Sequence, residues 1–177
     1  MPHIHTETGQ HDLTVAAYII RIDMPQPKAL LHMHRKLERL LPVGGHVELN
    51  ETPWQALAHE VEEESGYRFT ELKVLQPKRR LREIRAVVQH PYPLSINTHE
   101  VTEGHFHTDI QYAFRVTASP TQSASEGESL DLRWVTQDEM NALSEDLIYL
   151  GTKDIYNFMF DEVVKNWEEV PTNSFGL

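Results

Sequence analysis

The stretch from Gly44 to Tyr67 constrains the fold and the chemistry of this chain more than any other part. A glycine pair leads through a short acidic segment into a helix-like pattern, GGHVELNETPWQALAHEVEEESGY. Thr52 suits the position before a helix, Pro53 suits the first helical position, and Gln55 completes a capping box. Gly66 suits a left-handed helix end. These signals predict one helix between Thr52 and Gly66.

The spacing within this predicted helix separates two faces. Four apolar residues recur at helical spacing and predict a buried stripe. Three glutamates at spacings of three and four share a second face, where like charges repel. A bound cation would relieve that repulsion, and Mg²⁺ commonly takes one or two carboxylates together with substrate phosphates. The alternative is a solvated acidic surface. The apolar stripe comprises Trp54, Leu57, Ala58 and Val61, and the acidic face comprises Glu60, Glu63 and Glu64.

The whole stretch resembles the signature of the Nudix hydrolases. That signature is a Gly, five residues, a Glu, seven residues, then Arg-Glu-apolar-any-Glu-Glu-any-Gly-apolar. The residues from Gly45 to Tyr67 follow it with one departure, because His59 occupies the Arg position. The resemblance implies an α+β fold of the Nudix type, an α/β/α sandwich with a mixed β-sheet. Strand and helix patterns elsewhere in the chain favour the same α+β class.

The resemblance also implies roles for residues of the stretch. The resemblance implies that the three glutamates bind the metal and carry out catalysis. One of them would act as the general base, and the resemblance does not identify which one. The Gly44 carbonyl would add a backbone metal ligand. The cofactor implied is Mg²⁺, with Mn²⁺ as a substitute. These catalytic and metal-binding glutamates are Glu60, Glu63 and Glu64.

Four further residues are expected to shape the loop and brace it against the helix. In the family pattern Glu51 pairs with the Arg position, which is His59 here. Arg carries a permanent charge on a planar fork, whereas His is charged only near or below its pKa. The brace is therefore either weakened or pH-sensitive, or a neutral His59 still forms a hydrogen bond with Glu51. The bracing set is Gly45, Glu51, His59 and Gly66.

Length and composition limit the remaining possibilities. The 177 residues are 40% apolar and 24% charged, which is ordinary for one globular domain. The formal net charge of −11 argues against a nucleic-acid partner and against polybasic membrane attachment. The absence of cysteine excludes thiolate metal sites and also isopentenyl diphosphate isomerisation, which by resemblance needs an active-site cysteine. No bilayer-crossing stretch or signal peptide is evident, so we expect a cytoplasmic protein.

The domain organisation is expected to be simple. Residues 1–11 are polar and predict a flexible N-terminal tail, although their histidines could bind a metal. Residues 12–170 predict a single Nudix hydrolase domain, and the residues after the last helix read as loose. Strands are predicted over residues 13–22, 29–34, 46–49, 94–99, 105–116 and 130–135, and helices over residues 136–143 and 152–168.

Basic residues supply candidates for substrate contacts. Lys36 and Arg39 lie just before the glycine pair, where they either contact phosphates or form a solvated connection. Residues 77–85 are the most basic run of the chain. This run is open to three interpretations: a solvated insertion, a surface helix, or a patch for an anionic group.

The strand predicted over residues 105–116 places His105, His107 and Asp109 on one face. The histidines could contact phosphates or a leaving group, with Asp109 orienting one of them. Alternatively, the three could form a separate iron or zinc site. A later loop often supplies a further carboxylate in the family that this chain resembles, and Glu126 and Glu128 are the candidates here.

The predicted function is a Mg²⁺-dependent hydrolase that cleaves the pyrophosphate of a small nucleoside diphosphate linked to another moiety. Phosphoryl transfer needs mainly positioning and charge neutralisation, which metal ions held by carboxylates provide. ADP-ribose-like compounds, nucleoside triphosphates and dinucleoside polyphosphates all remain open as substrates. The alternative is a non-catalytic nucleotide-binding or sensor module. No oligomeric state is predicted.

Overall fold

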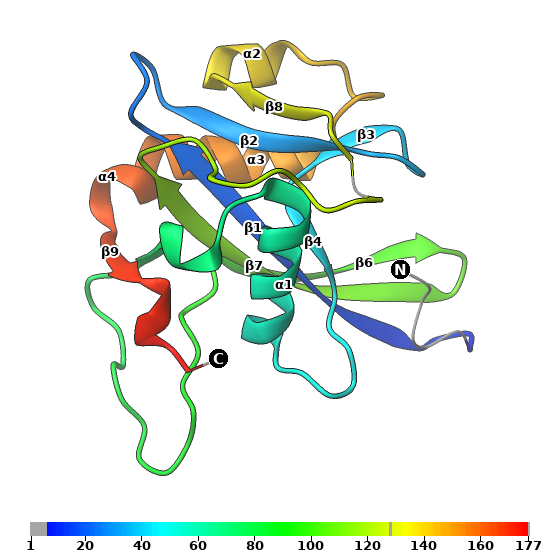
Figure 1. The fold of residues 1–177 in the computed structure, drawn as a ribbon. Coiled ribbons are helices and arrows are strands. Elements are labelled where there is room, and N and C mark those ends of the chain that lie inside the picture. The colour runs from blue at the N-terminus through cyan, green and yellow to red at the C-terminus, as the bar shows by residue number, and fades with distance from the viewer. Residues whose placement is uncertain (1–6, 128, 177) are drawn as a thin grey trace.

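The computed structural model describes residues 7–127 and 129–176. Within this part of the chain, nine strands form one mixed sheet with the order β3-β2-β1-β7-β5-β9, while β4 pairs with β1, β6 with β7, and β8 with β2 (Figure 1). The strands are β1 (His11–Arg21), β2 (Lys28–His34), β3 (Arg39–Leu41), β4 (Val43–His46), β5 (Lys73–Gln76), β6 (Ser95–Thr102), β7 (His105–Val116), β8 (Leu132–Val135) and β9 (Glu168–Pro171).

The two longest strands form the centre of the sheet. β1 and β7 run parallel and stay in register from the pair His11 and Phe106 to the pair Arg21 and Val116. The other strand pairs are antiparallel. The central position of β1 and β7 follows from their composition, because β-branched and aromatic side chains pack well on both faces of a covered sheet.

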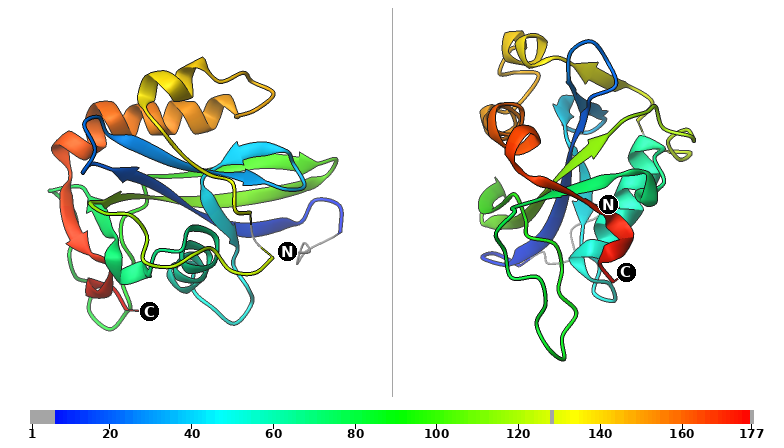
Figure 2. Two further views of the ribbon diagram at one scale, coloured as in Figure 1. Left: turned by 45° about the horizontal axis from the view of Figure 1, so that its top comes forward. Right: turned by 90° about the vertical axis from the view of Figure 1, so that its left-hand side faces the viewer.

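Helices cover the two faces of the sheet and make the predicted α/β/α sandwich (Figure 2). On one face, Val15 and Ile19 of β1 pack with Trp54 of α1 (Pro53–Ser65). On the other face, Tyr18 of β1 packs with Tyr156 of α3 (Leu150–Phe158). The remaining helical segments are η1 (Phe69–Glu71), α2 (Gln137–Ala142), η2 (Met159–Val163), α4 (Val164–Asn166) and η3 (Thr172–Ser174).

The helix α1 has the predicted bounds and the predicted ends. The Thr52 side chain accepts from the Gln55 backbone N–H at 3.3 Å, and the Gln55 side chain accepts from the Thr52 N–H at 2.9 Å. This reciprocal capping box satisfies donors that the first turn leaves without a helical partner. Gly66 ends the helix with φ of 73°, and a Cβ there would lie 2.3 Å from the carbonyl oxygen of Gln122. Only glycine fits this position.

The structure differs from the predicted boundaries at both ends of the chain. Residues 1–6 lie outside the described residues, but Gly9 donates to the Gly104 carbonyl at 2.6 Å and His11 begins β1. At the other end β9 pairs with β5, and Phe175 packs against Trp54. Residues 9–11 and 171–175 therefore take part in the fold outside the predicted range of 12–170, because they contact distant segments of the chain.

The glycine pair and the last predicted helix also differ from expectation. Gly44 and Gly45 lie inside β4, paired with Ala16 and Val15, rather than in a loop before a strand. The predicted helix over residues 152–168 becomes α3, a π-helical segment and a short last helix before β9. Residues 77–85 contain no helix. In the described part of the chain, no helix has the length and apolar character to cross a membrane.

Candidate functional site

The acidic face of α1 meets the glycine pair of β4. The Gly44 backbone N–H donates to the Glu64 carboxylate at 2.9 Å. A Cβ on Gly45 would lie 2.1 Å from Oε1 of Glu60, so this carboxylate rests directly against the strand backbone. Glu60 and Glu64 are both buried. Gly45 is thus required by the close approach of a carboxylate-bearing helix to the strand, whereas a Cβ on Gly44 would lie 2.1 Å from the Val15 carbonyl oxygen of β1.

A pocket of about 480 Å³ opens beside these carboxylates. Glu60 and Glu63 contribute to its wall, whereas Glu64 points toward Gly44. Among the described residues, the lining contains four glutamates and neither lysine nor arginine, and such a set of hard oxygen donors suits Mg²⁺. The observed donors therefore fit the metal that the sequence implies. The pocket is lined by Glu48, Asn50, Glu51, Gln55, Ala56, His59, Glu60 and Glu63.

Glu51 and His59 occupy the positions expected of the brace. Nδ1 of His59 lies 3.0 Å from Oε2 of Glu51, and the other oxygen of Glu51 accepts from the Glu48 N–H at 2.9 Å. Glu51 therefore links the loop backbone to the helix. The His59 side chain is 70% exposed, so solvent screens any charge that it carries.

His32 is a neighbour of the site that the sequence pattern did not single out. It lies on β2, is almost fully buried, and its Nδ1 is 3.6 Å from Oε1 of Glu64. Burial, and secondarily the nearby His34, lowers the pKa of His32 to about 4. The imidazole is thus neutral at neutral pH and adds no positive charge beside the acidic helix. Alternating histidines at positions 32 and 34 were the available sequence signal.

The loop between β7 and β8 crosses the end of α1. The Ser125 N–H donates to the Glu63 carbonyl at 2.7 Å, and the Gln122 N–H donates to the Gly66 carbonyl at 3.1 Å. Glu126 follows Ser125 directly, so the backbone holds this predicted additional carboxylate beside the helix. The other candidate, Glu128, lies outside the described residues.

The basic residues before the glycine pair are placed differently from each other. Lys36 is exposed in the turn between β2 and β3. Arg39 donates to the Glu145 carbonyl, and its guanidinium lies 4.4 Å from the centre of the Tyr149 ring. Arg39 therefore contacts the connection between α2 and α3, and these contacts do not include the acidic pocket.

The basic run over residues 77–85 has partners within the fold. Arg80 and Arg82 both pair with Glu168 at the start of β9. Of the three interpretations of this run, the surface helix is wrong, because residues 77–85 are irregular in the structure. Through these ion pairs, the two arginines connect residues 77–85 to β9.

The polar face of β7 lies on the opposite side of the sheet from α1. Strand register places His107 beside Asp12, and Asp109 beside Thr14. These four residues share a face of the sheet with Ala16, which packs in the hydrophobic cluster that includes Tyr156 of α3. Asp109 accepts from Thr14 at 3.1 Å and from Gln111 at 2.8 Å. Burial raises the pKa of Asp109, and these two hydrogen bonds oppose that rise.

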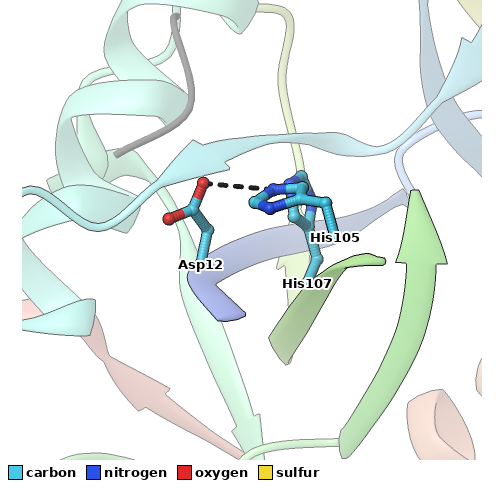
Figure 3. Close-up of side chains that lie close together, drawn as sticks. All are labelled: Asp12, His105 and His107. Atoms are coloured by element: carbon cyan, nitrogen blue, oxygen red, sulfur yellow. Dashed lines mark ion pairs between the residues drawn. The ribbon is translucent and has the colours of Figure 1, made fainter. Parts of the chain in front are cut away.

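The alternative iron or zinc set of His105, His107 and Asp109 is not the group of potential ligands that the structure brings together. The ligand atoms of Asp12, His105 and His107 all lie within 4.8 Å of one another, and among the described residues this is the group of potential ligands that meets that limit (Figure 3). The carboxylate comes from β1 instead of β7 because the parallel pairing of these strands sets Asp12 next to His107. The glutamates of α1 are more widely spread.

Comparison with known proteins agrees with the fold and the glycine–glutamate stretch. The model of the NUDIX domain matches residues 12–156. The chain belongs to the Nudix family. By that membership it is a Nudix pyrophosphohydrolase, an enzyme that acts on acid anhydrides. A search of curated protein sequences found no match.

Several solved structures resemble this Nudix protein. A NUDIX-family hydrolase from Clostridium perfringens is 25% identical, with a TM-score of 0.66, 85% of this chain covered and 96% of that one. An Ap4A hydrolase from C. elegans is 14% identical, with a TM-score of 0.59 and coverage of 84% and 95%. The NUDIX domain of NrtR from Shewanella oneidensis, solved with ADP ribose, is 15% identical, with a TM-score of 0.54 and coverage of 84% and 87%. The last two show a shared fold.

Proposed function

We propose that this Nudix protein is a Mg²⁺-dependent hydrolase that cleaves the pyrophosphate of a small nucleoside diphosphate linked to another moiety. The observation that carries the proposal is the pocket of about 480 Å³ beside α1, with Glu60 and Glu63 in its wall. Its size falls in the range of small-molecule sites. Its concentration of carboxylates requires a cation before an anionic substrate can enter.

Glu60, Glu63 and Glu64, together with the Gly44 carbonyl, are proposed to hold the metal. When bound, Mg²⁺ or Mn²⁺ neutralises phosphate charge and lowers the pKa of a coordinated water. The chain itself holds Glu60 against Gly45, fixes Glu64 through the Gly44 N–H, and presents Glu63 to the pocket. One of these glutamates accepts the proton of the attacking water.

Residues beyond α1 are proposed to complete the site. Glu126 is proposed to add a further carboxylate to the site, because the Ser125 N–H donates to the Glu63 carbonyl and holds this loop beside α1. Lys36 is proposed to contact a substrate phosphate, since this residue is exposed in the turn between β2 and β3. Arg39 is not proposed as a phosphate contact, because its guanidinium contacts Glu145 and Tyr149.

The substrate class is proposed to be a small nucleotide, with ADP-ribose-like compounds and nucleoside triphosphates as first choices. Structural neighbours that act on Ap4A or bind ADP ribose share the fold and make these compounds rational probes. A net charge of −11 makes nucleic acid an unsuitable partner.

A substrate panel tests the proposal. Purified protein is incubated with ADP-ribose, nucleoside triphosphates or diadenosine tetraphosphate, and nucleoside monophosphate and phosphate products are measured with Mg²⁺, with Mn²⁺ and with a chelator. We expect turnover of at least one compound, lost with the chelator. Tight nucleotide binding without turnover under either metal would contradict the proposal and favour the sensor module instead.

A further inference from the structure

A second group of metal-ligand residues lies outside the acidic pocket, on the other face of the sheet. Asp12 of β1 is fully buried, and its Oδ2 is 3.4 Å from Nε2 of His105 and 3.5 Å from Nε2 of His46. The ring of His107 lies 4.9 Å from that of His46 and 5.4 Å from that of His105. Figure 3 shows the Asp12 carboxylate directed toward the histidine rings of β7.

Three different strands bring this group together. Register pairs Asp12 with His107 between β1 and β7, and Thr14 with His46 between β1 and β4. Since alternate residues of a strand share a face, Asp12, His46 and His107 all lie on the face opposite α1. His46 directly follows Gly45, which contacts Glu60 on the α1 face. The group is therefore separated from the acidic pocket by the thickness of β4.

The distances suit a bound ion better than direct hydrogen bonds. Hydrogen bonds from nitrogen to a carboxylate are about 2.7–2.9 Å long. Ligand atoms around a tetrahedral ion with bonds of about 2.0–2.1 Å lie about 3.3–3.5 Å apart. The two separations at Oδ2 of Asp12 match the second value, and the potential ligand atoms of Asp12, His105 and His107 all fall within 4.8 Å of one another.

Burial adds a second argument for an ion. A carboxylate removed from water is costly unless positive charge accompanies it. Asp12 is fully buried, and His105 is nearly so. A divalent ion would place further positive charge beside this buried carboxylate. Imidazole nitrogens with one carboxylate suit Zn²⁺ and similar transition metals, whereas Mg²⁺ prefers oxygen.

We propose that Asp12, His105 and His107 bind one divalent transition-metal ion, with Zn²⁺ as the expected species, beside His46 of β4. The site joins β1 and β7, beside β4, at the end of the sheet that α3 leaves uncovered (Figure 1). The ion is structural and distinct in position and donor type from the proposed Mg²⁺ site, so its presence does not depend on the proposed hydrolysis.

Calorimetric titration of the chelator-treated full chain with Zn²⁺, in the presence of excess Mg²⁺, tests the site. Co²⁺ is titrated separately, and its visible d–d absorption reports four-coordinate geometry. The variants are Asp12→Asn, His105→Gln and the less buried His107→Gln. His11→Gln is the matched control, because His11 neighbours Asp12 but is exposed and stacks on Phe106. Glu63→Gln separates the result from the acidic pocket.

The parent is expected to bind one Zn²⁺ and to gain about 5–10 °C in Tm at a free Zn²⁺ concentration of 100 times Kd. Loss of an outer-shell partner alone costs 10- to 100-fold in metal affinity, so loss of a direct ligand should cost at least about 100-fold. His11→Gln and Glu63→Gln should keep the parent affinity. Unchanged Zn²⁺ binding in folded His107→Gln and Asp12→Asn would overturn the proposal and assign the binding to other histidines, including His3 and His5. Absence of binding by the parent would overturn it as well.

Discussion

At the scale of single residues, the close contact between Gly45 and Glu60 restricts the residue type at position 45. A Cβ at position 45 would lie 2.1 Å from Oε1 and 2.5 Å from Cδ of Glu60. Gly45→Ala should therefore leave the fold intact but move the carboxylate. Because a displacement of about 1 Å in a catalytic arrangement can cost 100-fold in rate, we expect kcat/KM to fall about 10- to 100-fold.

Steady-state kinetics with Mg²⁺, paired with thermal unfolding, measures this effect. Gly151→Ala is the control, since a Cβ on Gly151 meets no atom within 4 Å. A Gly45→Ala variant as active as the parent would show that the position of Glu60 does not matter for turnover.

At the same scale, the contact of His59 with Glu51 can be tested by substitution. His59→Arg should preserve activity, because an arginine can donate to Glu51 as the family pattern expects. His59→Leu removes the partner at 3.0 Å and should lower kcat/KM about 2- to 10-fold, which corresponds to one ordinary hydrogen bond. Equal kinetics for the arginine and leucine variants would mean that the contact between Glu51 and His59 does not brace the site.

At the scale of elements, the reciprocal cap of α1 fixes where the acidic face begins. Thr52→Ala removes the side-chain acceptor of the Gln55 N–H. We expect a loss of about 1 kcal/mol in the free energy of unfolding and a Tm lower by about 2–4 °C. Urea unfolding gives the first value and calorimetry the second. Thr117→Ala, at an exposed position just after β7, should change neither, and an equal loss in both variants would argue against the cap.

The elements that the sequence predicted well are those with local causes. The bounds of α1 follow from Thr52, Pro53 and Gly66, and all three act within one turn of the helix end. In contrast, β9 and the inclusion of the glycine pair in β4 depend on pairing with distant strands. Nothing near residues 168–171 signals that β5 offers an open edge there. Local chemistry was therefore sufficient for the helix and insufficient for the short strands.

At the scale of the whole molecule, Glu168 joins the basic insertion to the last strand. The hydrogen bond from Arg80, assisted by Arg82, lowers the pKa of Glu168 below its usual 4.5. A carboxyl whose pKa is lowered by folding stabilises the fold above its unfolded value, and this contribution is lost as pH falls through the folded-state pKa. Glu168→Gln should thus lower Tm at pH 7, and the difference from the parent should shrink below about pH 4.5.

Thermal unfolding between pH 7 and the acid range measures that difference. Glu103→Gln, at an exposed position in the turn between β6 and β7, is the control and should follow the parent curve. A Glu168→Gln difference that stays constant with pH would show that the ion pair does not contribute through the charge of Glu168.

The same scale explains why the alternative metal set included Asp109 and not Asp12. From the sequence, Asp109 is the acidic neighbour of His105 and His107, and Asp12 adjoins the predicted tail. The parallel pairing of β1 with β7 joins residues almost a hundred positions apart, which strand alternation alone does not reveal. The Nudix signature predicted the acidic helix because its residues are contiguous. The proximity of Asp12 to the histidines of β7 becomes visible only when the pairing of β1 with β7 is known.

The most direct test of the proposed hydrolase is a comparison of Glu63→Gln with Glu62→Gln in the Mg²⁺-dependent release of nucleoside monophosphate. Glu63 lines the pocket, whereas Glu62 accepts from the Phe69 N–H at 2.9 Å, a contact that glutamine preserves. We expect kcat to fall at least about 100-fold in Glu63→Gln and to stay near the parent value in Glu62→Gln. A Glu63→Gln variant that hydrolyses its substrate like the parent would contradict the assignment.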